Sequence, residues 1–398
     1  MAVTWNEATI IWAWMGDNDR SMVYYHCAGQ WMRKKTTGAQ PSWFFNGTAQ
    51  VHDDKMWLIG EGKYADAVVI YSLDLKTWSW TMTTPSGMQP LCMLPMGSRI
   101  SGGSYVCPLN SWIHNDKIYC LGAFGKGQEQ DGPKYLGVRR WRDSPIFCYN
   151  ISANRYEWPD LKGDTPSFRA MSSVIIKDDT VFMFGGAQFH GSGILTSSLN
   201  DLYTLDMITL TWNRIHGSLS PSLLIPCSRY GHTLTRISES VAVLYGGRYL
   251  STNGENINGQ REAICMDDVC WLLDLKKIEE LETTKGNVWT KMPYRVPSSL
   301  HKAVLEPSSK RLLVLGGVDE EGKFMEDILK MSFKATKISP YRALPLKYLA
   351  MEYATRIPEG DPRLEAGQIA HMLKNEIEVS RPTWWYFLSM GISLKKGE

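Results

Sequence analysis

The sequence predicts an all-β fold made of six similar antiparallel units, and two observations carry this prediction. The first is composition: the 398 residues include 34 glycines, 16 tryptophans and 18 tyrosines, which favours many short strands joined by tight turns. The second is a repeat, in which an apolar β-type run ends in glycine, a variable loop follows, and a second β-type run leads to a tryptophan.

The glycine-ended runs recur six times along the first 338 residues. They end, in chain order, at Gly16, Gly60, Gly122, Gly185–Gly186, Gly246–Gly247 and Gly316–Gly317. Five of the units continue to a tryptophan, namely Trp31, Trp78, Trp158, Trp212 and Trp289. One such sheet cannot bury both of its faces, so the units are expected to pack around a ring with the tryptophans between neighbouring sheets.

This order of elements resembles the kelch repeat, and six copies imply a six-bladed kelch β-propeller over residues 1–338. A β-sandwich would also explain alternating strands, but it does not account for the regular order of glycine and tryptophan. Two connections, 125–144 and 249–267, are long for a propeller. The first unit lacks an obvious partner strand, so the N-terminal segment VTWNEA is expected to close the ring by pairing with the last blade.

Residues 339–398 show a different pattern and predict a short α-helical C-terminal tail. Helix formers without strand alternation indicate helices near 345–356 and 363–378, separated by a Pro-Glu-Gly-Asp-Pro break. One apolar stripe follows helical i, i+3, i+4, i+7, i+8 spacing and consists of Leu346, Leu349, Ala350, Tyr353 and Ala354. On this evidence alone, the stripe fits an amphipathic helix that packs on the propeller.

Two segments of the tail carry a further resemblance. Residues 345–354 (PLKYLAMEYA) are similar to the elongin-binding box of cullin-RING ligase receptors, with Ala350 where the family usually has cysteine. Residues 369–373 (IAHML) are similar to the cullin-2 box, with Ala370 in place of its proline. The order resembles kelch-domain-containing substrate receptors of cullin-2 ubiquitin ligases that read C-terminal degrons. The resemblance implies partner contacts with elongin B/C and cullin-2 at Leu346, Ala350, Ala354, Ile369 and Leu373.

The resemblance weakens at the degron pocket. Those receptors hold the substrate's terminal carboxylate with two arginines and a serine, a charge-assisted and bidentate arrangement. At the matching places this chain has Ala187, Ser198 and Tyr230. Trp141 matches an aromatic residue of the family's pocket wall, and its alternative role is packing within the loop. Arg229 and Arg248 could supply cations from neighbouring blades, or they are charges at the rim of the propeller. The expected substrate-binding residues are therefore Trp141, Arg229, Tyr230 and Arg248.

Catalytic motifs are absent from the sequence. It contains no G-x-S-x-G, H-E-x-x-H, Walker or dinucleotide-binding pattern. His232 could be considered a catalytic base, but in a kelch unit a histidine at this place more often hydrogen-bonds the innermost strand. The eight cysteines form no C-x-x-C pair, so neither a zinc site nor a disulfide framework is indicated. We expect a non-catalytic protein with no cofactor and no metal; a propeller enzyme is a remote alternative.

Charge and hydropathy argue against two classes of partner, nucleic acid and the lipid bilayer. With 43 basic and 41 acidic side chains the net charge is +2, which gives no broad footprint for nucleic acid. No apolar run approaches the roughly 18–20 residues that span a bilayer, and the N-terminus lacks secretory-signal features. The cysteine pattern, typical of reduced thiols, predicts a cytoplasmic or nuclear protein, and the resemblance implies that it binds a protein substrate. The rival interpretation is a kelch interaction scaffold that recruits no ligase.

Overall fold

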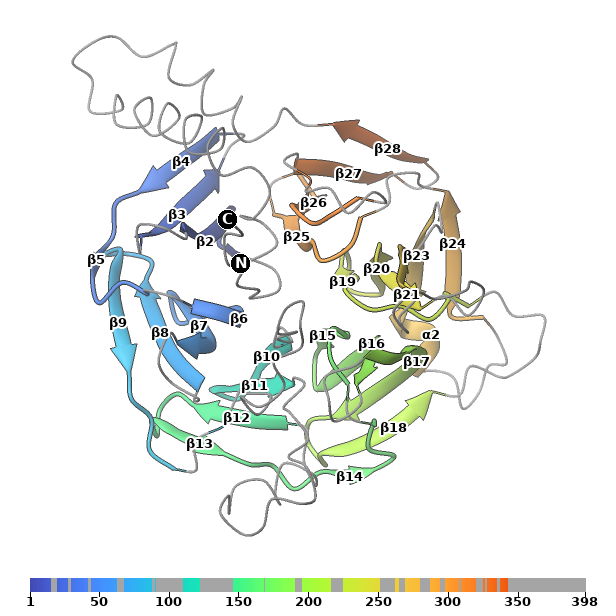
Figure 1. Cartoon of the computed structure of the whole chain (residues 1–398), viewed down its shortest axis with the longest axis horizontal. Helices are drawn as coiled ribbons and strands as arrows, with labels where there is room; N and C mark the ends of the chain where they lie inside the picture. Colours follow the sequence, from blue (N-terminus) through green and yellow to red (C-terminus); the bar gives the residue numbers. More distant parts are fainter. Residues whose placement is uncertain are drawn as a thin grey trace, which may run out of the picture.

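Six antiparallel sheets stand around a central axis as the blades of a propeller (Figure 1). The computed structural model describes residues 1–15, 20–27, 30–41, 44–62, 68–87, 90, 110–121, 146–167, 169–189, 195–215, 225–250, 262–264, 269–279, 287–293, 298–307, 309–319, 325, 328–334 and 337–342. Within the four antiparallel strands of each blade, the first strand along the chain lies innermost and later strands lie progressively outwards. The prediction of an all-β, six-bladed propeller is confirmed.

The first three blades have the following strands. Blade 1 contains β1 (Ala2–Trp5), β2 (Ala8–Met15), β3 (Arg20–Cys27) and β4 (Gln30–Lys34). Blade 2 contains β6 (Phe44–His52), β7 (Lys55–Gly62), β8 (Val68–Asp74) and β9 (Ser79–Thr83), with β5 (Thr37–Gly38) on its outer edge. Blade 3 contains β10 (Asn110–His114), β11 (Lys117–Leu121), β12 (Ile146–Asn150) and β13 (Arg155–Glu157).

The last three blades repeat the arrangement. Blade 4 contains β15 (Ser173–Lys177), β16 (Thr180–Phe189), β17 (Leu195–Asp206) and β18 (Thr211–Ile215), with β14 (Lys162–Gly163) on its outer edge. Blade 5 contains β19 (Thr233–Arg236), β20 (Val241–Tyr245), β23 (Val269–Asp274) and β24 (Trp289–Pro293), and carries the ribbon β21 (Arg248–Leu250) and β22 (Glu262–Ile264). Blade 6 contains β25 (Lys302–Glu306), β26 (Arg311–Leu315), β27 (Ile328–Lys334) and β28 (Lys337–Arg342).

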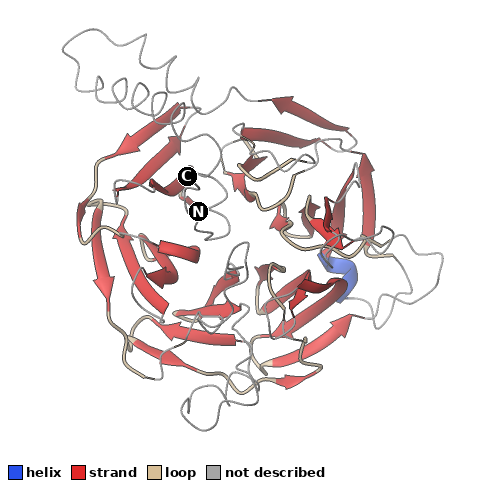
Figure 2. Ribbon diagram, viewed as in Figure 1, coloured by secondary structure: helices blue, strands red, loops and turns tan. Residues whose placement is uncertain are grey.

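Strands dominate the described part of the chain (Figure 2). The helix described there is the short α2 (Leu275–Glu279), which follows β23 in blade 5. No described helix is long and apolar enough to cross a membrane. β28 runs across the domain boundary expected at residue 338, and residues 343–398 lie outside the described residues. The division into propeller and helical tail therefore stays a prediction.

One large aromatic residue on the outermost strand fills the space between neighbouring blades. In blade 4 this residue is Trp212, which is fully buried in a cluster formed by blades 3 and 4. Strand register places Trp80 at the same position in blade 2 and Tyr156 in blade 3, and both are buried. Trp78 lies instead in the turn before β9 with a φ of 58°, and Trp158 follows the end of β13. Each of the two tryptophans expected to pack between blades is therefore two residues away from the residue that does so: Trp78 precedes Trp80, and Trp158 follows Tyr156.

The ring closes differently from the sequence expectation. β1 pairs with β2 inside blade 1 and lies beside β25, so the segment VTWNEA does not pair with the last blade. The contact between blades 6 and 1 is made by side chains instead. His26 Nδ1 lies 2.9 Å from Glu306 Oε1 with both side chains buried, and Ser309 donates a hydrogen bond to the other Glu306 oxygen. Trp31 lies over the His26 ring and packs in the apolar cluster of this seam.

Connections between consecutive blades cover the outer edge of the next sheet. β5 pairs in parallel with β9, β14 pairs in parallel with β18, and Ser86 bridges to Arg155 of β13. Each connection places a glycine beside the edge strand and a proline three residues later: Gly38 and Pro41, Gly87 and Pro90, Gly163 and Pro166. A Cβ at Gly163 would lie 2.2 Å from the Trp212 carbonyl oxygen, so only glycine fits. Paired edges are protected against pairing with other chains.

The contact between His26 and Glu306 should hold the first and last blades together. We expect Glu306→Ala and His26→Ala each to lower the free energy of unfolding by about 1–3 kcal/mol, because each removes one member of a buried hydrogen-bonded pair. The double variant should lose less than the sum, with a coupling of about 1 kcal/mol, measured by chemical denaturation. Ile208→Ala, at a side chain that is 73% exposed, is the control. Additive losses at positions 26 and 306 would show that the contact does not join the blades.

Candidate functional site: the Gly-Gly face of blades 4 to 6

Three short segments lead into the innermost strands of blades 4, 5 and 6 and occupy equivalent positions. We call residues 169–173, 229–233 and 298–302 the inner turns; their sequences are RAMSS, RYGHT and SSLHK. They lie at the end of the propeller where Gly185–Gly186, Gly246–Gly247 and Gly316–Gly317 are found, which we call the Gly-Gly face. Their equivalence is shown by three antiparallel bridges, Ala170 to Ala187, Tyr230 to Arg248 and Ser299 to Val318.

The inner turns are hydrogen-bonded to one another across the blade boundaries. The third residue of each turn has left-handed backbone geometry, with φ of 53° at Met171, 66° at Gly231 and 60° at Leu300. Gly231 N donates to Met171 O at 3.0 Å, and Leu300 N donates to Gly231 O at 2.7 Å. Non-glycine residues at positive φ are strained, so the surrounding contacts must stabilise Met171 and Leu300 in this geometry.

The double glycines allow the neighbouring turn to approach. Gly246 has a φ of +66°, and a Cβ there would lie 2.0 Å from Ser298 O and 2.6 Å from His301 Cε1. In the same place Gly247 N donates to Ser298 O at 2.9 Å. Glycine is therefore required for two reasons, the backbone conformation and the close approach of the next blade.

Two buried histidines hold these turns in place through hydrogen bonds. His232 Nε2 lies 3.1 Å from Phe184 O in blade 4, while His301 contacts Ser298 Oγ at 3.1 Å and Thr233 Oγ1 at 2.9 Å. Burial lowers the pKa of His232 to about 3, with a further contribution from Arg229. Burial and then Lys302 lower the pKa of His301 to about 3. Both rings are thus neutral near pH 7. His232 hydrogen-bonds β16, the second strand of blade 4, and not an innermost strand as expected.

Two arginines occupy the first position of the inner turns in blades 4 and 5. Arg169 donates from both Nη groups to the Asp201 carboxylate and also to Gly185 O at 3.2 Å. Arg229 has no exposed surface; it donates to Gly246 O at 3.0 Å, to Cys227 O at 3.1 Å and to Cys227 Sγ at 3.1 Å. The Arg229 guanidinium thus points at main-chain carbonyls and a sulfur of blade 5. Its contribution to a binding site would be to hold the turn in place.

Tyr230 and Arg248 are brought together in blade 5. Each backbone N–H donates to the other's carbonyl oxygen at 2.8 Å. The Tyr230 side chain is buried, whereas that of Arg248 is half-buried and its Nε donates to Ser299 Oγ in blade 6 at 2.8 Å. Among the predicted substrate-binding residues that the structure describes, Arg248 is thus the one whose side chain reaches the solvent.

The remaining predicted site residues cannot be placed in this way. They lie outside the described residues and stay predictions: Trp141, Leu346, Ala350, Ala354, Ile369 and Leu373. The structure does describe the positions where the resembling family has its carboxylate-binding side chains. Ala187 is fully buried, and Ser198 Oγ donates to Ser228 Oγ at 3.0 Å. Ser299 was missed in the sequence because leucine, not glycine, follows it, which hides its equivalence to Tyr230.

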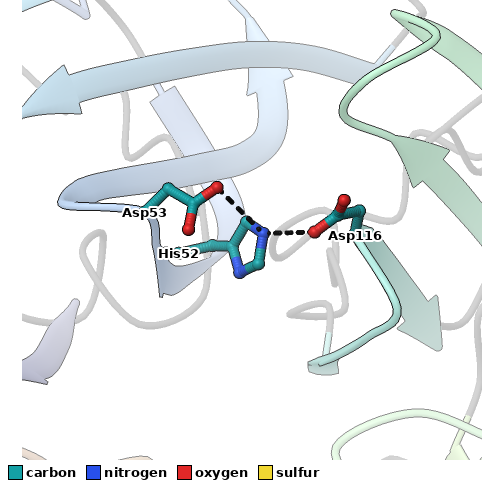
Figure 3. Close-up of side chains that lie close together, drawn as sticks. All are labelled: His52, Asp53 and Asp116. Atoms are coloured by element: carbon teal, nitrogen blue, oxygen red, sulfur yellow. Dashed lines mark hydrogen bonds and ion pairs between the residues drawn. The ribbon is translucent and has the colours of Figure 1, made fainter.

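The opposite face of the propeller carries a cluster of possible metal ligands. His52 Nε2 lies 2.7 Å from Asp116 Oδ1 and 3.5 Å from Asp53 Oδ2 (Figure 3). The same contact recurs one blade further on, where His114 Nε2 lies 2.7 Å from Asp179 Oδ1. Because the contact repeats at equivalent hairpins, its evident role is to join neighbouring blades, and we assign no metal to it.

Comparison with known proteins agrees with the fold. No protein-family model matches the chain. It is 26% identical over 380 residues to acyl-CoA-binding domain-containing protein 5 of Arabidopsis thaliana, and the matched region covers 92% of this chain and 50% of that protein. It is 21% identical over 327 residues to Kelch domain-containing protein 1 of Mus musculus, covering 78% of this chain and 70% of that protein. The chain thus spans about half the length of the plant relative.

A solved structure of the protein YjhT superposes with a TM-score of 0.55 and 15% sequence identity, covering 85% of this chain and 96% of that one. This likeness concerns the fold alone. Together, the kelch-domain relatives and the six blades support a kelch β-propeller.

The buried histidines predict a specific pH dependence of stability. Because their pKa in the folded protein lies near 3 and the usual value is 6.5, the unfolded chain binds more protons between these limits. Stability should therefore fall as the pH drops from 6.5 towards 3, by at most about 1.4 kcal/mol per pH unit for each histidine.

The measurement is chemical denaturation of the wild type and His301→Gln at several pH values between 7 and 4. The variant should be less stable at pH 7 but show a shallower decline, because one titrating group is gone. Carboxylates that lose charge in acid contribute equally to both proteins and cancel in the comparison. Parallel curves would contradict the role assigned to His301.

Proposed function

We propose that this chain is the substrate-recognition subunit of a cullin-RING ubiquitin ligase. In this proposal the propeller binds a segment of a protein substrate at the Gly-Gly face, and the tail recruits elongin B/C and cullin-2. The chain itself catalyses nothing, and ubiquitin transfer is performed by its partners. It would act in the cytoplasm, the nucleus or both.

The observation that carries the proposal is the place of the tail motifs relative to the completed ring. Each blade has at least four strands formed by described residues up to Arg342, where β28 ends. The segment similar to the elongin-binding box begins at Pro345, three residues later. A receptor needs this arrangement, because the recruiting segment must be able to bind a partner without removing a strand from the propeller.

Substrate capture is assigned to the Gly-Gly face of blades 4 to 6. Its inner turns are cross-linked by backbone hydrogen bonds, which favours the binding of a protein segment because little ordering is needed on complex formation. Arg248 and Tyr230 lie there, and Trp141 is assigned to the same site by its resemblance to an aromatic of the family's pocket wall. The degron type is left open, since Ala187 and Tyr230 replace the family's arginines.

A kelch scaffold without ligase recruitment is the second candidate. The relatives and the fold support protein interaction in general, and this function needs no elongin-binding box. The two candidates differ in one respect that can be measured. In the scaffold, the tail helix packs on the propeller and contributes to its stability.

Replacing Leu346 with arginine should separate the candidates. If the helix binds in a groove of elongin B/C, the arginine places a charge without a counter-ion in that groove, so elongin B/C should no longer co-purify. Ala350→Glu should act in the same way by overpacking and desolvation. Lys347→Glu lies off the apolar stripe and is the matched control, and Ile369→Arg should release cullin-2 while elongin B/C is retained.

Thermal melting of the same variants completes the test. The receptor proposal expects unchanged melting temperatures, because the ring is complete without the tail. A lowered melting temperature for Leu346→Arg, together with wild-type protein that never co-purifies with elongin B/C, would reject the ligase proposal and favour the scaffold.

A further inference from the structure

The outer edge of β4 in blade 1 has no strand paired with it among the described residues. At three other edges, the segment that follows one blade covers the outermost strand of the next blade: β5 on β9, Ser86 on β13 and β14 on β18. We call such a segment a cover. Around the ring, blade 1 is next to blade 6 (Figure 1). The corresponding segment for β4 is therefore the chain after β28, which lies outside the described residues.

Strand register identifies the residue of β4 that a cover must reach. Trp31 is the second residue of β4, as Trp80 is of β9 and Tyr156 is of β13. In blade 2 the Trp80 carbonyl oxygen accepts a hydrogen bond from Ala39 N of the cover at 3.0 Å. In blade 3 Tyr156 N donates to Ser86 O of the cover at 2.9 Å. The backbone of Trp31 is thus the place where a cover would bind on blade 1.

A cover has to place a glycine beside this residue. Gly38 lies beside Trp80 with a φ of 78°, and Gly87 lies beside Tyr156 with a φ of 91°. A Cβ at these glycines would lie 2.3 Å and 2.8 Å from the respective carbonyl oxygens. The backbone conformation and the close approach therefore both require glycine. The first glycine after β28 is Gly360, in the Pro-Glu-Gly-Asp-Pro break of the tail.

The length of chain before Gly360 fits a cover. In the three described connections, three to five residues lie between the end of the preceding outermost strand and the glycine. Seventeen residues lie between Arg342, where β28 ends, and Gly360. The helix predicted at 345–356 accounts for twelve of them, so five remain as connection. The break lies between the two predicted helices, where the backbone groups are not used within a helix.

Charge at this edge favours the same segment. Residues 20–52 contain four arginines and lysines and no acidic residue, and Arg33 and Lys35 are exposed. Gly360 stands between Glu359 and Asp361, and no other glycine after β28 has an acidic residue on both sides. Each exposed ion pair contributes little to stability, but the sign of the charges agrees with pairing at this edge.

We propose that the break at residues 358–362 pairs with the outer edge of β4 and places Gly360 beside Trp31. The segment takes the position that β5 has on β9 and that β14 has on β18. The segments similar to the elongin-binding box and the cullin-2 box lie on either side of it in the sequence, so this docking holds both of them near blade 1. The inference does not depend on the ligase proposal, because the docking needs no partner.

Amide hydrogen exchange at single-residue resolution in the full-length protein tests the docking. The Trp31 amide should exchange as slowly as the Tyr156 amide, which donates to Ser86 O in the cover of blade 3. In Gly360→Ala the Trp31 amide should exchange on the order of tenfold faster, with the Tyr156 amide unchanged. Gly87→Ala, in the cover of blade 3, should accelerate the Tyr156 amide alone and calibrates the size of the effect.

Other occupants of the edge give other results. Gly367→Ala is the matched control in the tail and should leave the Trp31 amide slow; faster exchange in this variant and not in Gly360→Ala would overturn the assignment. Fast exchange of Trp31 in the wild type would show an open edge and would also overturn it. Slow exchange that is lost on dilution would assign the edge to a second copy of the chain instead. Slow exchange that Gly360→Ala abolishes, in a protein that does not co-purify with elongin B/C, would support the docking and reject the ligase.

Discussion

The close contact between each double glycine and the inner turn of the following blade is the constraint on which the rest of the Gly-Gly face depends. Gly246 lies so near Ser298 that a single methyl group would overlap its carbonyl oxygen. That proximity lets the left-handed residues Met171, Gly231 and Leu300 form successive backbone hydrogen bonds from blade 4 to blade 6. The turns therefore behave as one unit, and the side chains they carry are positioned by backbone.

The two ends of the propeller use different chemistry to join the blades. At the Gly-Gly face the contacts are backbone hydrogen bonds and neutral buried histidines. At the opposite face, in blades 1 to 3, a side chain at the end of the innermost strand reaches the hairpin of the next blade: Trp5 to Asp54, His52 to Asp116 and His114 to Asp179. Aspartate and asparagine suit these hairpins because they tolerate positive φ. The exposed side chains of these three pairs are thus explained by contacts between blades.

Much of the fold could be predicted from the sequence because it depends on a repeat of residue types. The order of glycine and tryptophan was enough to give six antiparallel units and a ring. Strand register could not be predicted in the same way: Trp78 and Trp80 are both plausible packing residues, and only the pairing with Leu73 selects Trp80. The predicted ring closure was wrong because the first strand pairs with its neighbour in blade 1. The buried contact between His26 and Glu306 joins residues 280 positions apart, so no local sequence pattern indicates it.

The candidate site was harder to predict than the fold. Arg229 and Arg248 look alike in the sequence, yet one is fully buried among carbonyl groups and the other reaches the solvent. Burial of an arginine depends on neighbouring blades, which the sequence does not place. Ser299 carries no signal of its own, because its importance comes from the distance to a side chain 51 residues earlier. The alignment of inner turns that reveals it requires the bridges in the structure.

Native-state hydrogen exchange, read by mass spectrometry on peptides that cover 229–233 and 298–302, tests most directly whether the inner turns form one rigid unit. The Gly231 and Leu300 amides should exchange as slowly as those of the innermost strands, because opening them requires separating blades. Exchange of these two amides at the rate of exposed loops would contradict the account, since Arg248 and Ser299 would then have no fixed support.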